Sequence, residues 1–248
     1  PRGRGLESSP SPAKAWALER GIDVLTPATL KDPGVAEALA NTDWDVFVVA
    51  AYAKLIPKNI LDIPRRGCLN VHPSLLPKFR GPSPALSAIL ADEKVTGVSV
   101  MLMSEKMDTG PVVAQGRVEL EEEAWPPRGS LFEDLLAQEG GTLLAEVLPE
   151  WIAGEITAEP QDEAAATYSR KFTDADARID PKGGYAELLK IRAFDKGPRA
   201  YFLEHGPSTS SLQADSTSSL QAKRVLVPEA QMQGDPLELL NVIPAGKK

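Results

Sequence analysis

Residues 70–81 read Asn-Val-His-Pro-Ser-Leu-Leu-Pro-Lys-Phe-Arg-Gly, and this stretch decides how the chain is interpreted. An apolar run ends in a polar Asn-x-His pair, and a proline-punctuated loop follows at once. Side chains at i and i+2 of a strand point to the same face, so Asn70 and His72 should project together from a strand over residues 68–72. An amide donor beside an imidazole suits a reaction in which a carbonyl oxygen gains negative charge while an amine loses a proton.

The preceding and following residues alternate short apolar runs with helical segments. Strands are expected at residues 22–25, 45–51, 68–72, 97–103 and 112–120, and helices at 13–20, 32–41, 57–61, 84–91 and 130–154. The run at 45–51 lacks alternation, as in a parallel strand buried on both faces. Ser130, with Glu133 three residues on, is the expected N-cap of the last helix. This order predicts a parallel-sheet α/β domain, whose ligands bind beyond the carboxyl ends of strands.

The pattern weakens after residue 155. Residues 157–166 are polar with little periodicity and are typical of a linker. A helix is expected at 185–194 and strands at 223–227 and 237–243, which indicates a small β-rich domain. A Ser/Thr-rich tandem repeat at 208–214 and 216–222 is most simply a flexible insertion without chemistry. We therefore expect a catalytic domain at 1–156, a linker at 157–175 and a C-terminal domain at 176–248.

Composition limits the possible functions. With 42% hydrophobic and 25% charged residues, the 248-residue chain is typical of a globular protein, and it contains no apolar run long enough for a membrane span. The single cysteine, Cys68, excludes an internal disulfide and a cysteine-rich zinc site, and the distant histidines His72 and His205 offer no metal cluster. A net charge of −8 argues against nonspecific nucleic-acid binding through the whole surface. It leaves open a local basic patch in the C-terminal third, where ordinary solvated helix faces are an equal alternative.

The 70–81 motif resembles the signature of folate-dependent formyltransferases, which move a formyl group from 10-formyltetrahydrofolate to an amine. The family also carries a downstream Asp-x-Gly, matched here by Asp108-Thr109-Gly110. The resemblance implies a Rossmann-like parallel-sheet formyltransferase domain followed by a small β-barrel (OB-like) C-terminal domain. An apolar strand that merely ends in a Pro/Gly loop is the alternative without chemistry.

The flanks of the motif favour one branch of that family. Residues 2–5 and 10–14 resemble the mobile loop of methionyl-tRNA formyltransferases, and residues 168–171, 177–180 and 192–201 resemble their linker and first C-terminal helix. The resemblance implies formylation of initiator methionyl-tRNA for translation initiation. A formyltransferase for a sugar nucleotide or another small amine is the second possibility, and a non-catalytic folate- or RNA-binding remnant is the third.

The resemblance also implies roles for individual residues. Asn70 would donate to the oxyanion, His72 would assist proton transfer, and Asp108 would orient or charge-balance His72. The folate site would involve Tyr52, Ala53, Lys54, Leu55, Ile56, Ser74, Leu75, Leu76 and Pro77. Contacts to tRNA would come from Arg2, Arg4, Lys171, Arg178 and Arg192, so affinity should fall with salt. We expect no metal, a monomer and a cytoplasmic location.

Two features of the chain differ from the methionyl-tRNA formyltransferase pattern. Those enzymes place a strand–helix–strand unit before the Arg-Gly-Arg-Gly loop, and their C-terminal domain continues beyond the point where residue 248 falls. On this comparison we expect the catalytic domain to lack its first strand–helix–strand unit and the C-terminal domain to be incomplete.

Overall fold

The computed structural model describes residues 10–52, 54–204, 223–232 and 237–244. Its contacts divide the chain after Thr42 into two compact units. Several residues singled out from the sequence lie outside the described residues: Arg2, Arg4, Ala53, His205 and the tandem repeat.

The first unit contains two short helices that begin within one residue of their predicted starts. Helix α1 (Pro12–Glu19) is capped by the Ser11 hydroxyl, and α2 (Pro33–Ala40) is capped by Asp32, whose carboxylate accepts the Gly34 N–H. Both helices have proline in the first turn, where its missing N–H costs nothing. The strand expected at residues 22–25 is wrong, because these residues have no regular structure. A strand needs a hydrogen-bonded neighbour, and the described residues of this unit contain no other strand.

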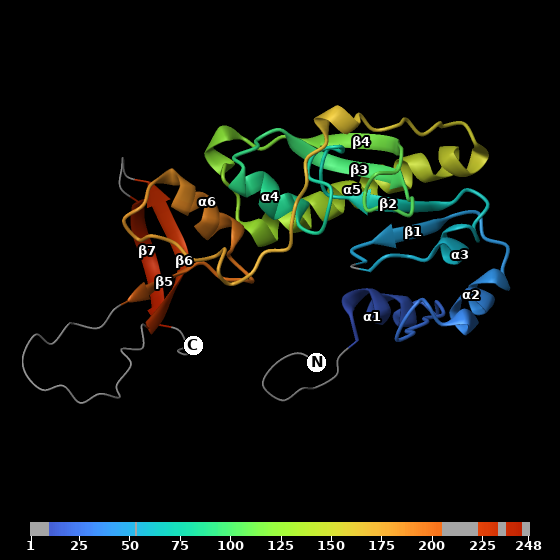
Figure 1. Cartoon of the computed structure of the whole chain (residues 1–248), viewed down its shortest axis with the longest axis horizontal. Coiled ribbons are helices and arrows are strands. Elements are labelled where there is room, and N and C mark those ends of the chain that lie inside the picture. The colour runs from blue at the N-terminus through green and yellow to red at the C-terminus, as the bar shows by residue number, and fades with distance from the viewer. Residues whose placement is uncertain (1–9, 53, 205–222, 233–236, 245–248) are drawn as a thin grey trace, which may run out of the picture. The chain divides into compact units, whose positions relative to one another are not determined.

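The second unit is built on a four-stranded sheet with the order β1-β2-β3-β4 (Figure 1). The strands are β1 (Phe47–Ala50), β2 (Cys68–His72), β3 (Thr96–Leu102) and β4 (Val112–Val118). Helix α3 (Lys58–Leu61) connects β1 to β2, which run parallel, as predicted. The β2–β3 and β3–β4 pairs are antiparallel. A wholly parallel sheet is therefore wrong, because the short β3–β4 connection cannot make the crossover that parallel strands require.

Strand β1 differs from its expected double burial. Val48 is 46% exposed and Ala50 is exposed, whereas Phe47 and Val49 are half-buried. The cause is its position at the edge of the described sheet, away from the strands that the long helix α5 (Gly129–Ala153) covers. Helix α5 packs on β2, β3 and β4, where Leu69 and Val100 are buried.

Helix α5 begins without the predicted serine cap. Its N-cap is Arg128, which makes no side-chain capping bond, and Ser130 is the second residue inside the helix. The Ser130 N–H donates instead to the Asp195 carboxylate at 2.9 Å. An acid at a helix N-terminus satisfies a free N–H and complements the helix dipole. This cap is contributed from 65 residues away in the sequence, so local spacing could not predict it.

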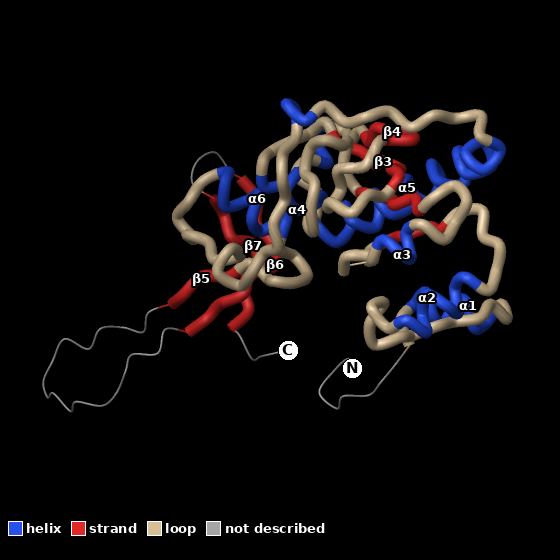
Figure 2. Tube along the Cα trace, turned by 45° about the vertical axis from the view of Figure 1, so that its right-hand side comes forward, coloured by secondary structure: helices blue, strands red, loops and turns tan. Residues whose placement is uncertain are grey.

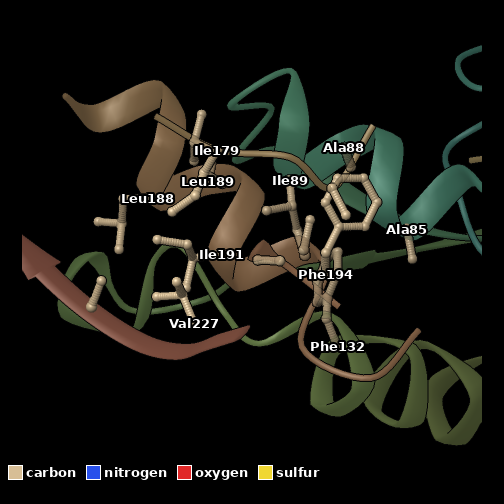
Figure 3. Close-up of a cluster of buried hydrophobic side chains, with 14 of the residues drawn as sticks. Ala85, Ala88, Ile89, Phe132, Ile179, Leu188, Leu189, Ile191, Phe194 and Val227 are labelled. Atoms are coloured by element: carbon tan, nitrogen blue, oxygen red, sulfur yellow. The ribbon is translucent and has the colours of Figure 1, made fainter. Parts of the chain in front are cut away.

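A second hydrophobic core joins the α/β sheet region to the C-terminal residues. Figure 3 shows Ala88 and Ile89 of α4 (Pro84–Leu90), Phe132 of α5, and Ile191 of α6 (Tyr185–Ala193) packed in one cluster. The cluster continues to a three-stranded antiparallel sheet of β5 (Tyr201–Glu204), β6 (Lys223–Met232) and β7 (Leu237–Pro244), which Figure 2 shows beside α6. Strands β6 and β7 confirm the predicted pair, and β5 was not predicted.

Two short 3-10 helices complete the described elements: η1 (Glu122–Ala124) lies between β4 and α5, and η2 (Glu163–Ala165) lies in the connection between α5 and α6. The second lies in the polar segment expected to be a linker. No helix in the described ranges is long and apolar enough to cross a membrane.

Candidate active site

His72 lies buried at the carboxyl end of β2, with 4% of its surface exposed. Strand alternation sends Leu69 and Val71 toward the α5 core, so Asn70 and His72 share the opposite face. The His72 Nε2 atom is 3.0 Å from the Phe79 carbonyl oxygen. Because a carbonyl can only accept, Nε2 carries the hydrogen and Nδ1 of the neutral ring keeps its lone pair.

Asp108 lies next to that lone pair. Its Oδ2 atom is 3.8 Å from His72 Nδ1, and the same oxygen accepts the Gly81 N–H at 2.7 Å. Burial lowers the pKa of His72 below its usual 6.5, while the Asp108 carboxylate and the Phe79 carbonyl act in the opposite direction. The imidazole is therefore neutral near pH 7, and the acid beside it favours the imidazolium once a proton arrives.

The Asp-x-Gly motif has a backbone reason for its residue types. Asp108 has φ of +53°, a left-handed conformation that aspartate tolerates better than most side chains. At Gly110, a Cβ atom would lie 1.8 Å from the Leu102 carbonyl oxygen, so the loop can pass the end of β3 only with glycine there. The backbone at these two positions allows a tight turn between β3 and β4, which brings the Asp108 carboxylate next to His72 of β2.

A neutral hydrogen-bond network, here called the inner network, holds residues 74–76 of the loop after β2. Ser99 Oγ donates to the Ser74 carbonyl at 2.6 Å and accepts from the Leu76 N–H at 3.0 Å. Gln115 Nε2 donates to both the Ser99 hydroxyl and the Leu76 carbonyl at 2.8 Å. Because Ser99 is fully buried on β3, these bonds are protected from water and fix the loop next to His72.

A charged network, here called the outer network, joins Arg80 to the segment at residues 161–169. Arg80 is fully buried, and its two terminal nitrogens donate to the Glu163 carboxylate at 2.9 and 2.8 Å. Arg80 Nε donates to Gln161 Oε1 at 3.0 Å, and Tyr168 accepts a further bond. Arg80 is thus held by protein groups on every side, which favours a structural role over a direct catalytic one.

The loop passes close to this segment at Gly81. Gly81 has φ of +112°, and a Cβ there would lie 2.7 Å from the Ser169 carbonyl oxygen. The backbones of residues 80 and 167–169 exchange hydrogen bonds, including Ser169 N–H to the Arg80 carbonyl at 2.7 Å. The expected linker therefore forms part of the wall around the Asp108 loop.

The predicted folate residues fall into two groups. Ala50 pairs in register with Val71, so the loop that follows β1 begins beside the carboxyl end of β2. In that loop Tyr52, Lys54 and Leu55 are exposed and Ile56 is half-buried. The residues after β2 behave differently: Ser74 and Leu76 are buried and Leu75 and Pro77 are half-buried. The Ser74 hydroxyl and the Leu76 N–H already bond within the protein, leaving these residues to shape a site.

The predicted tRNA residues that the structure describes lie away from His72 in sequence and differ in exposure. Lys171 and Arg178 are exposed, and Arg178 lines a hollow of about 440 Å³ with residues such as Phe202 and Leu203. Arg192 on α6 is half-buried, with no hydrogen-bond partner for its Nε atom within the described residues. No contact between these three side chains joins them within the described residues, so their shared role stays a prediction.

Sequence reasoning missed the residues that hold the site in place: Ser99, Gln115, Gln161, Glu163, Thr167 and Ser169. Ser99 left one usable signal, since a hydroxyl inside an apolar strand must find a partner when buried. Gln161, Glu163 and Thr167 left none, because their partners lie roughly 80 to 90 positions earlier in the sequence. The resemblance of residues 168–171 to the family's linker assigned no such role to Ser169. The described residues contain no group of three or more His, Cys, Asp or Glu side chains placed to hold a metal ion.

Comparison with known proteins shows the family to which the chain belongs. The family described as formyl transferase matches residues 1–144, and the chain belongs to that family. Methionyl-tRNA formyltransferase from Chloroflexus aggregans is 40% identical over 258 residues, covering 100% of this chain and 82% of that protein. Within the formyl transferases, the chain thus belongs with the methionyl-tRNA formyltransferases.

Solved structures agree on the fold. Methionyl-tRNA formyltransferase from Clostridium thermocellum aligns with a TM-score of 0.61 at 18% identity, covering 94% of this chain and 92% of that one. HypX from Aquifex aeolicus in complex with tetrahydrofolic acid aligns with a TM-score of 0.64 at 22% identity, covering 86% of this chain and 34% of that one. These likenesses support the Rossmann-like formyltransferase fold of the α/β region.

Proposed function

We propose that this chain transfers the formyl group of 10-formyltetrahydrofolate to the amino group of methionyl-tRNA, producing formylmethionyl-tRNA for translation initiation. The observation that carries the proposal is the 3.8 Å approach of His72 Nδ1 and Asp108 Oδ2 beside Asn70. It occurs in a chain that is 40% identical to a methionyl-tRNA formyltransferase. The strands and loops of the family fold thus bring three polar side chains of the expected types to the carboxyl end of β2.

The proposed reaction follows from these positions. The methionyl amine attacks the formyl carbon, a C–N bond forms, and the bond from that carbon to N10 of tetrahydrofolate breaks. Asn70 donates to the oxyanion of the tetrahedral intermediate. His72 Nδ1 accepts the proton that the amine loses, Asp108 stabilises the resulting imidazolium, and N10 of the leaving tetrahydrofolate gains a proton. Atoms and charge balance without a metal.

The substrate sites are part of the same proposal. The formyl donor binds along Tyr52, Lys54, Leu55 and Ile56, where a free loop follows β1, and Ser74, Leu75, Leu76 and Pro77 shape the opposite wall. Ala53 belongs to the same loop by its place in the sequence. The tRNA is held through Lys171, Arg178 and Arg192, with Arg2 and Arg4 reaching its acceptor end. These contacts involve phosphates and predict binding that weakens as salt rises.

The architecture beyond the α/β sheet completes the proposal. Residues 1–156 form the catalytic domain, 157–175 the linker and 176–248 an OB-like tRNA-binding domain. The antiparallel β5–β6–β7 sheet supports the last of these assignments, as one part of a small β structure. We further propose a monomer that acts in the cytoplasm.

The test is a transfer assay with purified chain, 10-formyltetrahydrofolate and methionyl-tRNA, run beside His72→Ala and an exposed-site control, Gln138→Ala. Circular dichroism checks that each variant is folded. Formylation by the parent and by Gln138→Ala, with loss in His72→Ala, supports both the reaction and the site. A folded parent that binds folate yet formylates only sugar-nucleotide amines would transfer the assignment to the second candidate. A folded parent that formylates neither amine would refute the proposal.

A further inference from the structure

Gln161 joins three parts of the site through one side chain. Its Nε2 donates to the carbonyl of Asp108 at 2.9 Å and to the carbonyl of Gly110 at 2.6 Å. Its Oε1 accepts from Arg80 Nε at 3.0 Å. The amide therefore uses both of its hydrogens on the loop that carries Asp108, and its oxygen on the loop that follows His72.

The Asp108 loop depends on these bonds for its position. Asp108 has a left-handed backbone conformation, which costs energy unless its surroundings hold it. Its carboxylate has one further anchor, the Gly81 N–H at 2.7 Å. Gln161 bonds the two carbonyls on either side of Thr109, so it fixes the backbone that carries the carboxylate. Both anchors come from residues outside the β3–β4 loop.

Gln161 is itself held firmly. Arg80 pairs with Glu163 two residues later, and the Phe79 N–H donates to the Thr167 hydroxyl at 2.8 Å. The segment at residues 161–169 is thus attached to the loop after β2 at two further residues, Glu163 and Thr167, which follow Gln161 in the chain. A side chain held in this way can transmit a fixed position to its partners, as a supporting shell does around a reacting group.

We propose that Gln161 is a positioning residue for formyl transfer: its amide holds Asp108 at its working distance from His72. The inference rests on the proposed function for its kinetic consequence, while the positioning itself is measurable without turnover. The segment between α5 and α6 then does more than connect these helices, because its Gln161 also holds Asp108 beside His72. The competing explanation is that Gln161 merely attaches the segment and affects stability alone.

The first experiment measures the His72 imidazole directly. A His205→Gln background leaves His72 as the single histidine of the chain, so its pKa can be followed by NMR with labelled histidine. The groups facing this ring are the Asp108 carboxylate, the Phe79 carbonyl and, on the neighbouring strand β3, the neutral Ser99. Asp108 raises the pKa of His72, so Asp108→Asn should lower it.

Gln161→Ala should lower the pKa of His72 in the same direction as Asp108→Asn, because a displaced carboxylate no longer favours the imidazolium. Gln138→Ala, a change at an exposed glutamine on α5, should leave it at the parent value. If Gln161→Ala is unstable, Gln161→Asn replaces it, since a side chain one methylene shorter cannot span all three partners. An unchanged pKa in Gln161→Ala, or in Asp108→Asn, would overturn the inference.

The second experiment separates positioning from attachment by kinetics. Gln161→Ala should reduce kcat by about 10- to 100-fold with KM for both substrates changed less than about threefold, as expected for misplaced catalytic geometry. Glu163→Gln weakens the neighbouring attachment but keeps the Gln161 amide and its bonds to the Asp108 loop, so its loss of kcat should be clearly smaller than that of Gln161→Ala. An equal loss in both variants would mean attachment alone and would overturn the inference.

The two proposals fail in different ways. A folded parent that formylates no amine refutes the proposed function, and the His72 titration then still decides whether Gln161 positions Asp108. An active parent whose kcat survives Gln161→Ala refutes the inference and leaves the function standing.

Discussion

The loops that follow β1 and β2 start side by side yet differ in how they are held. The loop after β2 is anchored by Ser99 and Gln115 on one side and by Arg80 and its partners on the other. In the loop after β1, residues 51, 52 and 54–56 make no hydrogen bond within the described residues, and Leu55 is 68% exposed. The same edge of one sheet therefore carries a rigid loop and an open one.

This difference matches the two demands of the proposed reaction. Proton transfer needs His72 and Asp108 held within a fraction of an ångström, so the loop around them is held by buried hydrogen bonds. A site for a large flexible co-substrate needs accessible surface and spare backbone groups. Changes in the first loop should thus affect stability and kcat, and changes in the second should affect KM.

The largest effect should come from breaking the outer network. Arg80→Ala removes a fully buried guanidinium that binds Glu163, Gln161 and Tyr168, and leaves a cavity with unmatched acceptors. We expect a loss of about 3 kcal/mol in the free energy of unfolding. Urea unfolding measures it, with Arg117→Ala as the control because Arg117 is exposed on β4. A loss below about 1 kcal/mol would mean that the network does not hold the loop.

The next largest effect should come from the inner network. Ser99→Ala deletes a buried hydroxyl that serves Ser74, Leu76 and Gln115, and so leaves buried backbone groups without partners. We expect a loss of about 2 kcal/mol in the free energy of unfolding. Ser87→Ala is the matched control, since its hydroxyl donates only to the carbonyl of Ser83, the N-cap residue of its own helix α4. Equal stability of the two variants would contradict the importance given to this network.

These networks also show what sequence could and could not predict. The strand at Cys68–His72 was predicted to the residue, because an apolar run ended by a polar pair and a proline has one plausible boundary. Helices α1, α2 and α4 were predicted within a residue or two for a similar reason, since proline marks each start. Local chemistry thus determined most elements and the motif that carries Asn70 and His72.

The misses share a different physical cause. The antiparallel return of β3, the exposed face of β1 and the Asp195 cap of α5 all depend on partners distant in sequence. The same holds for Gln161, whose polar neighbourhood resembles any linker until its partners are known. The spacing of apolar residues predicts which face of an element is buried, but it does not predict the hydrogen-bond partner of a buried amide side chain.

A smaller effect should appear in the pH dependence of the free energy of unfolding, through the buried ring of His72. Burial lowers the pKa of His72 below the 6.5 of the unfolded chain, so unfolding takes up a proton in that range. The stability contributed by the neutral ring is complete above about pH 6.5 and declines as the pH falls toward the folded pKa, by at most about 1.4 kcal/mol per pH unit. Urea unfolding at pH 7.5 and 5.5 should show a smaller decline in His72→Gln than in the parent. An equal decline would show that His72 is not the group responsible.

The smallest effect on stability should come from the open loop. Leu55→Ser changes a side chain that is 68% exposed, so the free energy of unfolding should move by less than about 0.5 kcal/mol. If the formyl donor packs on Leu55, its KM should rise about fivefold, because roughly 1 kcal/mol of apolar contact is lost equally from ground and transition states. The kcat should stay unchanged for the same reason.

Leu131→Ser provides the control for this last change, because Leu131 is 62% exposed on α5 and lies outside both loops. It should leave the KM for the formyl donor at the parent value. A fall in kcat with unchanged KM in Leu55→Ser would mean that the loop after β1 serves the reacting atoms instead of the donor. The contrast between a rigid catalytic loop and an open binding loop would then be wrong at this position, even if Arg80 and Ser99 stabilise the fold as expected.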